Sequence, residues 1–274
     1  MLLPAVPDSF AWVRQPWGDA LVCGPLAEVA PHVFTTRQLE LRLGGDHAEG
    51  WQAIADSLGV DTAHLVRLRQ VHGREVVVVQ RGGTEGPAKA GHYVLQEGPE
   101  ADAIVSNDPS TAVAVQAADC VPILMADRRT GAVAAVHAGW RGTAAGAAPA
   151  AIKAMTREFG TRPSDLVAAV GPSIGPCCYQ VGPELVDAFA AAGHRRERID
   201  RWFVDPLKRG QYVSQGELRL DLWAATGDQL IDAGLNEQNV HMCGLCTSSY
   251  LGVFYSFRAE GPATGRLAAA IRSR

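Results

Sequence analysis

Short apolar segments rich in valine and isoleucine recur along the chain, each bounded by glycine, proline or aspartate. This pattern is typical of short β-strands. The segments that fit it are 65–68, 75–80, 112–115, 121–126, 132–137, 167–170, 240–243 and 252–257. The short turns at 72–74 and 127–131 predict antiparallel hairpins, which disfavours a purely parallel sheet.

Helical patterns lie between these segments, at 47–58, 143–159, 183–191, 221–233 and 264–271. We therefore expect an α/β (α+β) fold in which helices sandwich mixed β-sheets. The chain has 274 residues, no visible repeat and no long linker, so a single domain is expected over residues 1–274. The glycine-rich stretch 81–99 and the polar stretch 194–216 are interpreted as surface excursions within that domain.

The charge and the apolar content of the chain indicate which kinds of binding partner to expect. The formal net charge is −4, so the chain lacks the basic excess that binding to nucleic-acid phosphates requires. No run reaches the ~18 consecutive apolar residues of a membrane helix. The first ten residues show neither a basic leader nor a long apolar run. We therefore expect no nucleic-acid or membrane partner, no secretory signal and a cytoplasmic location.

Six cysteines are too few for a disulfide scaffold and are interpreted as thiols or metal ligands. Cys177 and Cys178 are adjacent, and they form either a strained bridge or two independent thiols. Cys243 and Cys246 form a C-x-x-C pair that closely follows His241. Because a closed structural zinc site needs a fourth ligand, both structural zinc and plain buried thiols stay open there.

His72, Cys120 and His137 each lie at the end of a predicted strand, beside a glycine or proline turn. Two imidazoles and one thiolate would form a three-ligand zinc site with one open position, where bound water becomes a nucleophile. Ordinary turn histidines and a small buried cysteine are the alternative, because the spacing is no local metal signature. A third interpretation makes Cys120 a nucleophile with His137 as its base.

Several neighbouring residues suit substrate binding. The loop 171–179, which contains Cys178, is made rigid by glycine and proline and can direct amide N–H groups towards an anion or a base. Arg37 and Arg141 suit phosphate, and a solvated or ion-paired side chain is the default alternative for each of them. Asp119 is either a general acid or base, or a strand-end residue that bonds to local backbone. Neither a G-x-G-x-x-G nor a P-loop motif is present.

Four segments together resemble the YfiH-like family. They are RQVHG at 69–73, ADCVP at 118–122, VHAGWRG at 136–142 and GPSIGPCCY at 171–179. The resemblance extends from about Phe34 to the C-terminus. The family has been described as a laccase-domain or multicopper polyphenol oxidase family, and also as purine nucleoside phosphorylase and peptidoglycan editing factor.

The resemblance implies a fold similar to the deamidase domain of cytotoxic necrotizing factor, and metal ligands at His72, Cys120 and His137. Zinc is the implied metal, and copper is the alternative. The implied activities are phosphorolysis of adenosine, inosine, guanosine and methylthioadenosine, together with adenosine deamination. Purine nucleoside and phosphate would then be the ligands. Arg37 or Arg141 would hold phosphate, Asp119 would transfer protons, and the chain would be a monomer or homodimer.

The N-terminal part, residues 1–60, departs from the family pattern. The family shows a Gly-Gly-Val-Ser stretch after Phe-x-Thr-Arg, followed by Leu-Asn-Leu-Gly. This chain lacks the former after Phe34–Arg37 and has Arg42 in place of the asparagine. The missing loop lies near the family's substrate pocket, so we expect an altered substrate preference.

Three other functions are alternatives to a purine nucleoside enzyme. A copper polyphenol oxidase is disfavoured because the eight histidines form no H-x-H pair. A Cys–His hydrolase or peptidoglycan-precursor editor would use Cys120 as nucleophile, a role that a metal on its sulfur blocks. A non-catalytic purine- or zinc-binding module would bind without turnover.

Overall fold

Two six-stranded sheets pack face to face in this computed structural model, which describes residues 2–41, 47–81, 98–204 and 218–274. The first sheet has the order β1 (Phe10–Gln15), β2 (Gly18–Cys23), β3 (His32–Thr35), β14 (Leu267–Arg272), β7 (Ala112–Ala117), β4 (Leu65–Val66). The second has the order β13 (Val240–Met242), β10 (Leu166–Val170), β8 (Val121–Asp127), β9 (Val133–Ala138), β6 (Ala103–Ser106), β5 (Val76–Val79). A separate ribbon pairs β11 (Phe203–Val204) with β12 (Arg219–Leu220).

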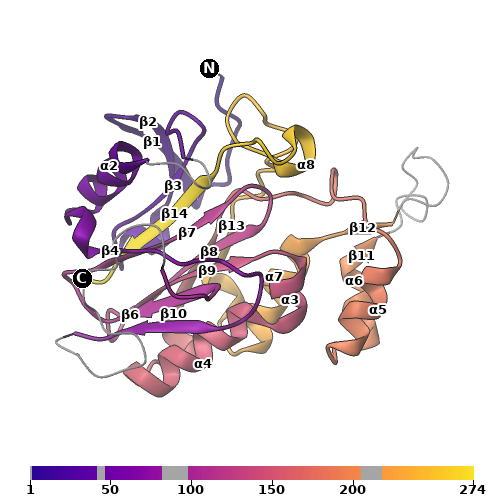
Figure 1. The fold of residues 1–274 in the computed structure, drawn as a ribbon. Helices are drawn as coiled ribbons and strands as arrows, with labels where there is room; N and C mark the ends of the chain where they lie inside the picture. Colours follow the sequence, from indigo (N-terminus) through magenta and orange to yellow (C-terminus); the bar gives the residue numbers. More distant parts are fainter. Residues whose placement is uncertain (1, 42–46, 82–97, 205–217) are drawn as a thin grey trace.

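Helices cover the outer faces of both sheets (Figure 1). Helix α2 (Ala48–Leu58) lies on the first sheet, whereas α3 (Trp140–Ala145), α4 (Ala147–Phe159) and α7 (Leu222–Asp232) lie on the second. The remaining helices are α1 (Gly24–Ala27), α5 (Glu184–Ala191), α6 (Arg196–Trp202) and α8 (Phe257–Glu260), with short 3₁₀ turns at Thr62–His64, Pro163–Asp165 and Glu237–Asn239.

The alternation of side chains along each strand explains this layering. In β7, Val113 and Val115 lie in the core between the sheets, while Ala112 and Ala114 pack in the core beneath α2. Successive side chains of a strand point to opposite faces, so both faces are buried. Burial of each valine contributes about 1.5–3 kcal/mol. Strands buried on both faces therefore read as continuous apolar runs.

The predicted fold class is confirmed, because parallel and antiparallel pairings mix within each sheet. The hairpin over 121–137 is confirmed as the antiparallel pair β8–β9. The prediction of a hairpin over 65–80 is wrong, since β4 and β5 belong to different sheets. The predicted helix 143–159 begins earlier and is divided at Gly146, whose φ of 79° is left-handed.

Two predictions near the C-terminus are also wrong. The sequence predicts a helix over 264–271, but residues 267–272 form β14, which lies between β3 and β7. Its alanines are good helix formers, and sheet pairing overrides that weak preference. Residues 252–257 form turns leading into α8 instead of a strand. The stretch 194–216 contains α6, whereas 82–97, 205–217 and Arg42 lie outside the described residues.

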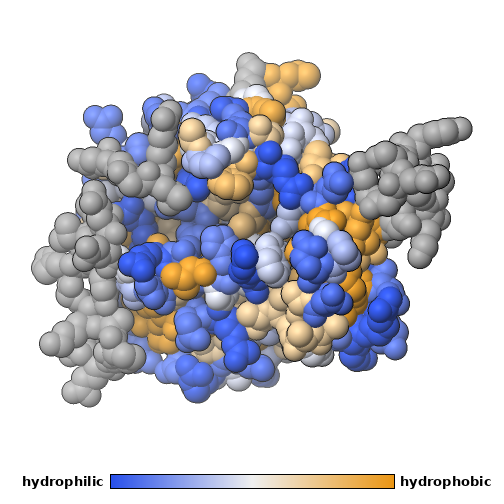
Figure 2. Space-filling model, turned by 45° about the vertical axis from the view of Figure 1, so that its right-hand side comes forward, coloured by the Kyte–Doolittle hydropathy of each residue, from blue (hydrophilic) through white to orange (hydrophobic). Residues whose placement is uncertain are grey.

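Within the described residues, none of the helices is both long and apolar enough to cross a membrane. On the face drawn in Figure 2, hydrophobic residues appear in separate patches between hydrophilic ones.

Candidate active site

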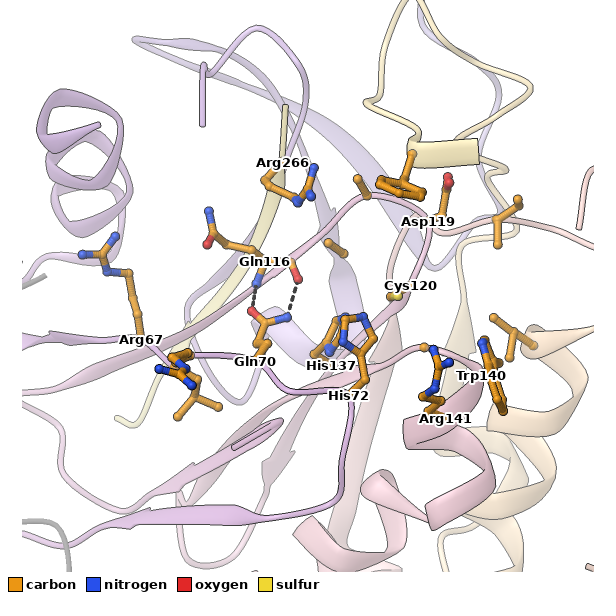
Figure 3. A pocket seen from close by; sticks show the side chains of 18 of the residues that line it. Arg67, Gln70, His72, Gln116, Asp119, Cys120, His137, Trp140, Arg141 and Arg266 are labelled. Carbon is orange, nitrogen blue, oxygen red and sulfur yellow. Dashed lines mark hydrogen bonds between the residues drawn. The ribbon is translucent and has the colours of Figure 1, made fainter. Parts of the chain in front are cut away.

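Three loops and strand ends bring His72, Cys120 and His137 together at one place (Figure 3). Their metal-binding nitrogen and sulfur atoms all lie within 4.8 Å of one another, and the two imidazole rings are 4.9 Å apart. His137 comes from β9, which pairs directly with β8 just after Cys120. His72 is exposed, Cys120 is half-buried and His137 is buried. The three residues predicted as metal ligands thus converge as expected for one site.

Asp102, just before β6, positions both histidines. Its side chain is fully buried and accepts a hydrogen bond from Nδ1 of His137 at 2.8 Å. It also accepts the backbone N–H groups of Val71, His72 and Gly73, at 3.3, 3.0 and 2.5 Å. Because Nδ1 of His137 is occupied, its Nε2 is the nitrogen available to a metal.

The backbone is strained at two site residues. His72 has a φ of 61° and Asp119 a φ of 89°, in the left-handed region that residues other than glycine rarely adopt. Such residues cluster at functional sites because the surrounding structure must hold them. Gly139 contributes space, since a Cβ there would lie 2.7 Å from Sγ of Cys120 and 3.2 Å from Cδ2 of His72. The positions of Cys120 and His72 therefore require glycine at residue 139.

The electrostatics favour a charged thiolate at Cys120. Burial raises the pKa of the thiol, but the neighbouring His137 and His72 outweigh burial and lower it to about 6. Burial lowers the pKa of His137, while Cys120 and Asp102 outweigh burial and raise it. The thiolate is the form of cysteine that binds metals and attacks electrophiles. The pair therefore suits either a metal ligand or a nucleophile.

Asp119, which is predicted to transfer protons or to bond to local backbone, has hydrogen-bond partners at both carboxylate oxygens. Its Oδ1 accepts a hydrogen bond from Oγ1 of Thr247 at 2.6 Å, and its Oδ2 accepts the backbone N–H of Arg258, also at 2.6 Å. Asp119 lines the cavity but is 8% exposed. Both carboxylate oxygens are therefore engaged, which indicates a positioning role beside Cys120.

A cavity of about 670 Å³ opens over the three candidate ligands. Five arginines line it, whereas Asp119 supplies the one carboxylate among the described lining residues. The arginines are Arg67, Arg69, Arg141, Arg258 and Arg266. This excess of positive charge favours an anionic ligand.

Three of these guanidinium groups lie over aromatic rings. Arg67 lies 4.2 Å from the centre of a Trp51 ring, and Arg141 lies 4.3 Å from that of Trp140. The third pair is Arg258 and Tyr179, at 5.1 Å. Such stacking holds each cation in a defined orientation. The wall of the cavity thus presents positioned cations and aromatic faces together (Figure 3).

Two residues predicted to bind phosphate or substrate do not line this cavity. The guanidinium of Arg37 donates to the carbonyl of Leu251 and pairs with Glu260 at 3.0 Å. Arg37 therefore connects the N-terminal part of the chain to α8 and to the segment before it. Cys178 lies against Ser249, with 3.3 Å between Sγ and Oγ. Arg141, by contrast, does line the cavity.

The C-x-x-C pair does not form a site with His241. Among the described residues, Cys246 groups with Cys177 and Cys178, while Cys243 is buried elsewhere. All six cysteines are free thiols.

Sequence reasoning missed Asp102, Arg67 and Gln70. Gln70 lines the cavity. Its Nε2 donates to the carbonyl of Gln116 and its Oε1 accepts the N–H of Gln116, both at 2.7 Å. A single aspartate inside the apolar stretch 101–105 was the available signal for Asp102, because a buried carboxylate needs partners.

Comparison with known proteins identifies the family. Residues 45–274 match the family described as multi-copper polyphenol oxidoreductase laccase. The chain belongs to this family. Its fold is similar to the crystal structure of the Bacillus licheniformis hypothetical protein YfiH, with a TM-score of 0.79 and 26% identity, covering 93% of this chain and 96% of that one. The predicted YfiH-like family is therefore confirmed.

Relatives in this family carry names of purine-nucleoside enzymes. A purine nucleoside phosphorylase from Bacteroides thetaiotaomicron is 35% identical over 170 residues, which cover 62% of this chain and 60% of that protein. Adenosine deaminase RL5, from an unknown prokaryotic organism, is 34% identical over 213 residues, covering 78% and 76%. These similarities support a purine nucleoside enzyme as the broad class.

Proposed function

We propose that this chain is a zinc-dependent purine nucleoside enzyme that carries out phosphorolysis of adenosine, inosine, guanosine and methylthioadenosine, and deamination of adenosine. The observation that carries the proposal is the His72–Cys120–His137 group at the base of an arginine-lined cavity. The names of the relatives support both reactions.

The three ligand residues fit zinc. Two imidazoles and one thiolate are an established zinc donor set, and three protein ligands leave one position open. Asp102 fixes the tautomer of His137 in the manner typical of metal-bound histidines. Zinc, when bound, would supply Lewis-acid activation of a water or phosphate oxygen.

The other residues of the cavity account for binding of the two substrates. Phosphorolysis joins a phosphate oxygen to C1′ of the ribose while the bond from C1′ to the purine breaks. Arg141 and Arg258 offer positioned cations for phosphate and for the charge that develops during this displacement. Trp140 and Tyr179 offer aromatic faces for the purine.

A thiol hydrolase is the second candidate, because the pKa of Cys120 is lowered to about 6 beside His137. In that case the sulfur attacks the substrate, and a metal on Cys120 would abolish activity.

A copper oxidase is supported by the family description alone. Within the described residues, two histidines belong to a group able to hold a metal, fewer than a laccase-type copper cluster uses.

The decisive experiment measures metal content and turnover together. The native protein, purified without added metal, is analysed for metals and assayed by HPLC with adenosine or inosine, with and without phosphate. Phosphate-dependent release of free base supports phosphorolysis, and release of inosine from adenosine supports deamination. Turnover of neither nucleoside overturns the proposal.

Cys120→Ala separates the zinc and thiol functions. Under the zinc proposal this variant loses one equivalent of metal relative to the native protein and also loses activity. Lost activity with unchanged metal content assigns Cys120 as a nucleophile instead. Cys243→Ala is the matched control, because Cys243 is a buried free thiol outside the cavity.

A further inference from the structure

A second group of sulfur atoms lies outside the cavity. The thiols of Cys177, Cys178 and Cys246 all lie within 4.8 Å of one another, and all three are free. Cys177 and Cys178 come from the rigid loop 171–179, whereas Cys246 comes from the segment after β13. Cys177 is exposed, Cys178 is half-buried and Cys246 is buried. The group is therefore reachable from solvent on one side.

Backbone pairing holds the two segments in place. Ser173 and Cys246 form a parallel β-bridge, in which Ser173 N–H donates to Leu245 at 3.2 Å and Thr247 N–H donates to Ser173 at 3.1 Å. The N–H groups of Cys178 and Tyr179 both donate to the carbonyl of Gly175, at 3.0 Å. Three thiols on two fixed backbones are arranged before any ligand arrives, which reduces the entropy cost of binding.

The spacing suits a soft cation. Zinc–sulfur bonds of about 2.3 Å place tetrahedral thiolate sulfurs ~3.8 Å apart. Sulfur atoms within 4.8 Å need to close by about 1 Å at most to reach that spacing. Thiolates select zinc and other thiophilic cations.

Polar groups lie next to the sulfur atoms. The N–H of Gly175 donates to Sγ of Cys246 at 3.3 Å. Oγ of Ser249 lies 3.3 Å from Sγ of Cys178 and 3.5 Å from Sγ of Cys177. The guanidinium of Arg219 donates to the carbonyl of Cys177 and places a positive charge next to the group. Such donors stabilise thiolate ligands of metals.

We propose that Cys177, Cys178 and Cys246 form a second metal site, which takes Zn²⁺ or another thiophilic divalent cation. Binding releases the thiol protons to solvent, and the hydroxyl of Ser249 or a water molecule completes the coordination. This site is separate from the His72–Cys120–His137 group, and it does not depend on the proposed nucleoside chemistry.

The second site also supports the wall of the cavity. Thr247 follows Cys246 and donates to Asp119, and the N–H of Ile174 donates to the Asp119 carbonyl at 2.9 Å. Tyr179 follows Cys178 and lines the cavity. A cation that joins the two segments would therefore fasten the residues that hold Asp119 beside Cys120.

Cobalt binding to Cys120→Ala tests the proposal. Co²⁺ substitutes for Zn²⁺, and its sulfur-to-metal charge-transfer absorption grows with the number of thiolate ligands. The full chain is reduced, stripped of metal and titrated in the presence of a phosphine reductant. We expect Cys120→Ala to bind one equivalent of Co²⁺ with strong charge-transfer absorption, displaced by Zn²⁺. Absence of this absorption overturns the proposal.

A second substitution locates the bound ion. Cys177 is exposed, so Cys177→Ser in the Cys120→Ala background leaves the packing intact. Loss of this ligand should weaken Co²⁺ binding at least about tenfold, because even outer partners of a metal ligand contribute 10–100-fold. Unchanged affinity overturns the assignment. Cys243→Ser in the same background is the control with expected native affinity.

Alkylation provides a readout independent of absorption. Zn²⁺ should slow the modification of Cys177 by iodoacetamide in Cys120→Ala, as followed by mass spectrometry. An equal rate with and without Zn²⁺ contradicts the proposal. Neither readout uses enzyme activity, so a failed nucleoside assay leaves the result unaffected.

Discussion

The buried carboxylate of Asp102 lies 2.8 Å from Nδ1 of His137 and 3.0 Å from the backbone nitrogen of His72. One side chain therefore positions both imidazoles of the candidate metal site, one through its ring and the other through its backbone. Burial raises the pKa of Asp102, but hydrogen bonds from His137 and from the backbone outweigh burial and lower it. Asp102 is thus an anion throughout the neutral pH range.

Asp102→Asn should weaken zinc binding about 10–100-fold, the usual effect of removing the partner of a metal-bound histidine. The amide has nearly the same shape but removes the charge and one acceptor oxygen. Competition with a chromophoric chelator measures the affinity in the Cys177→Ser background, where the second group of thiols is expected to bind metal more weakly. Asp200→Asn, on the exposed surface, is the control. Equal zinc affinities of the two variants would show that Asp102 does not support metal binding.

Gly139→Ala should disrupt the same site by crowding Cys120 and His72. The added Cβ would lie 2.7 Å from Sγ of Cys120, a distance at which one of the two atoms must move. We expect loss of about one metal equivalent and of nucleoside turnover, with circular dichroism close to that of the native protein. Gly252→Ala is the matched control, because no atom lies within 4 Å of its added Cβ. Full activity of Gly139→Ala would show that Cys120 and His72 can move to accommodate the added Cβ without loss of function.

The strand-end positions of the three candidate ligands could be predicted, but their convergence could not be derived from spacing. His72, Cys120 and His137 stand at turns after apolar strands, where side chains of a rigid scaffold become functional. The turn at His72 looks like a hairpin in the sequence, yet it connects β4 and β5 of different sheets. Nothing local encodes that crossing, so the resemblance to a family was needed to join the three residues.

The wrong helix prediction near the C-terminus and the surroundings of Arg37 have equally physical causes. The alanines of β14 favour a helix locally, whereas hydrogen bonding to β3 and β7 and packing of Ala268 and Ala270 in the cluster that contains the α2 side chains hold them in a strand. The guanidinium of Arg37 suggests phosphate in the sequence, whereas its partners in the structure, a carbonyl and a carboxylate, come from residues more than 200 positions away. Long-range pairing of this kind leaves no trace in the sequence around the residue.

Arg141→Ala should raise the KM for phosphate by about tenfold or more, since a charge-assisted hydrogen bond contributes about 1.5–3 kcal/mol. Deamination of adenosine, which uses no phosphate, should change little. Arg37→Ala is the informative comparison, because Arg37 binds Leu251 and Glu260 outside the cavity. That variant should lower the melting temperature and leave the KM for phosphate unchanged. The reverse pattern would return the phosphate role to Arg37.

His32 makes the fold sensitive to acid. Burial lowers the pKa of His32 to about 4, despite a hydrogen bond to the carbonyl of Ala30 that raises it. Its Nε2 accepts the N–H of Cys23 at 3.0 Å, so the ring is neutral in the folded chain. The unfolded chain, with a histidine pKa of about 6.5, takes up the proton first as the pH falls. The stabilisation is therefore complete above about pH 6.5 and is lost as the pH falls towards about 4.

Between about pH 7.5 and pH 5, this linkage should reduce the free energy of unfolding by about 2 kcal/mol. Urea titrations of the native protein and of His32→Gln measure it, because the variant keeps every other titrating group. The native protein should lose about 2 kcal/mol more than His32→Gln over that interval. His64→Gln, at an exposed histidine, should follow the native protein. Parallel pH profiles for native protein and His32→Gln would mean that His32 is protonated in the folded state, and that the Cys23 N–H is not bonded to its ring.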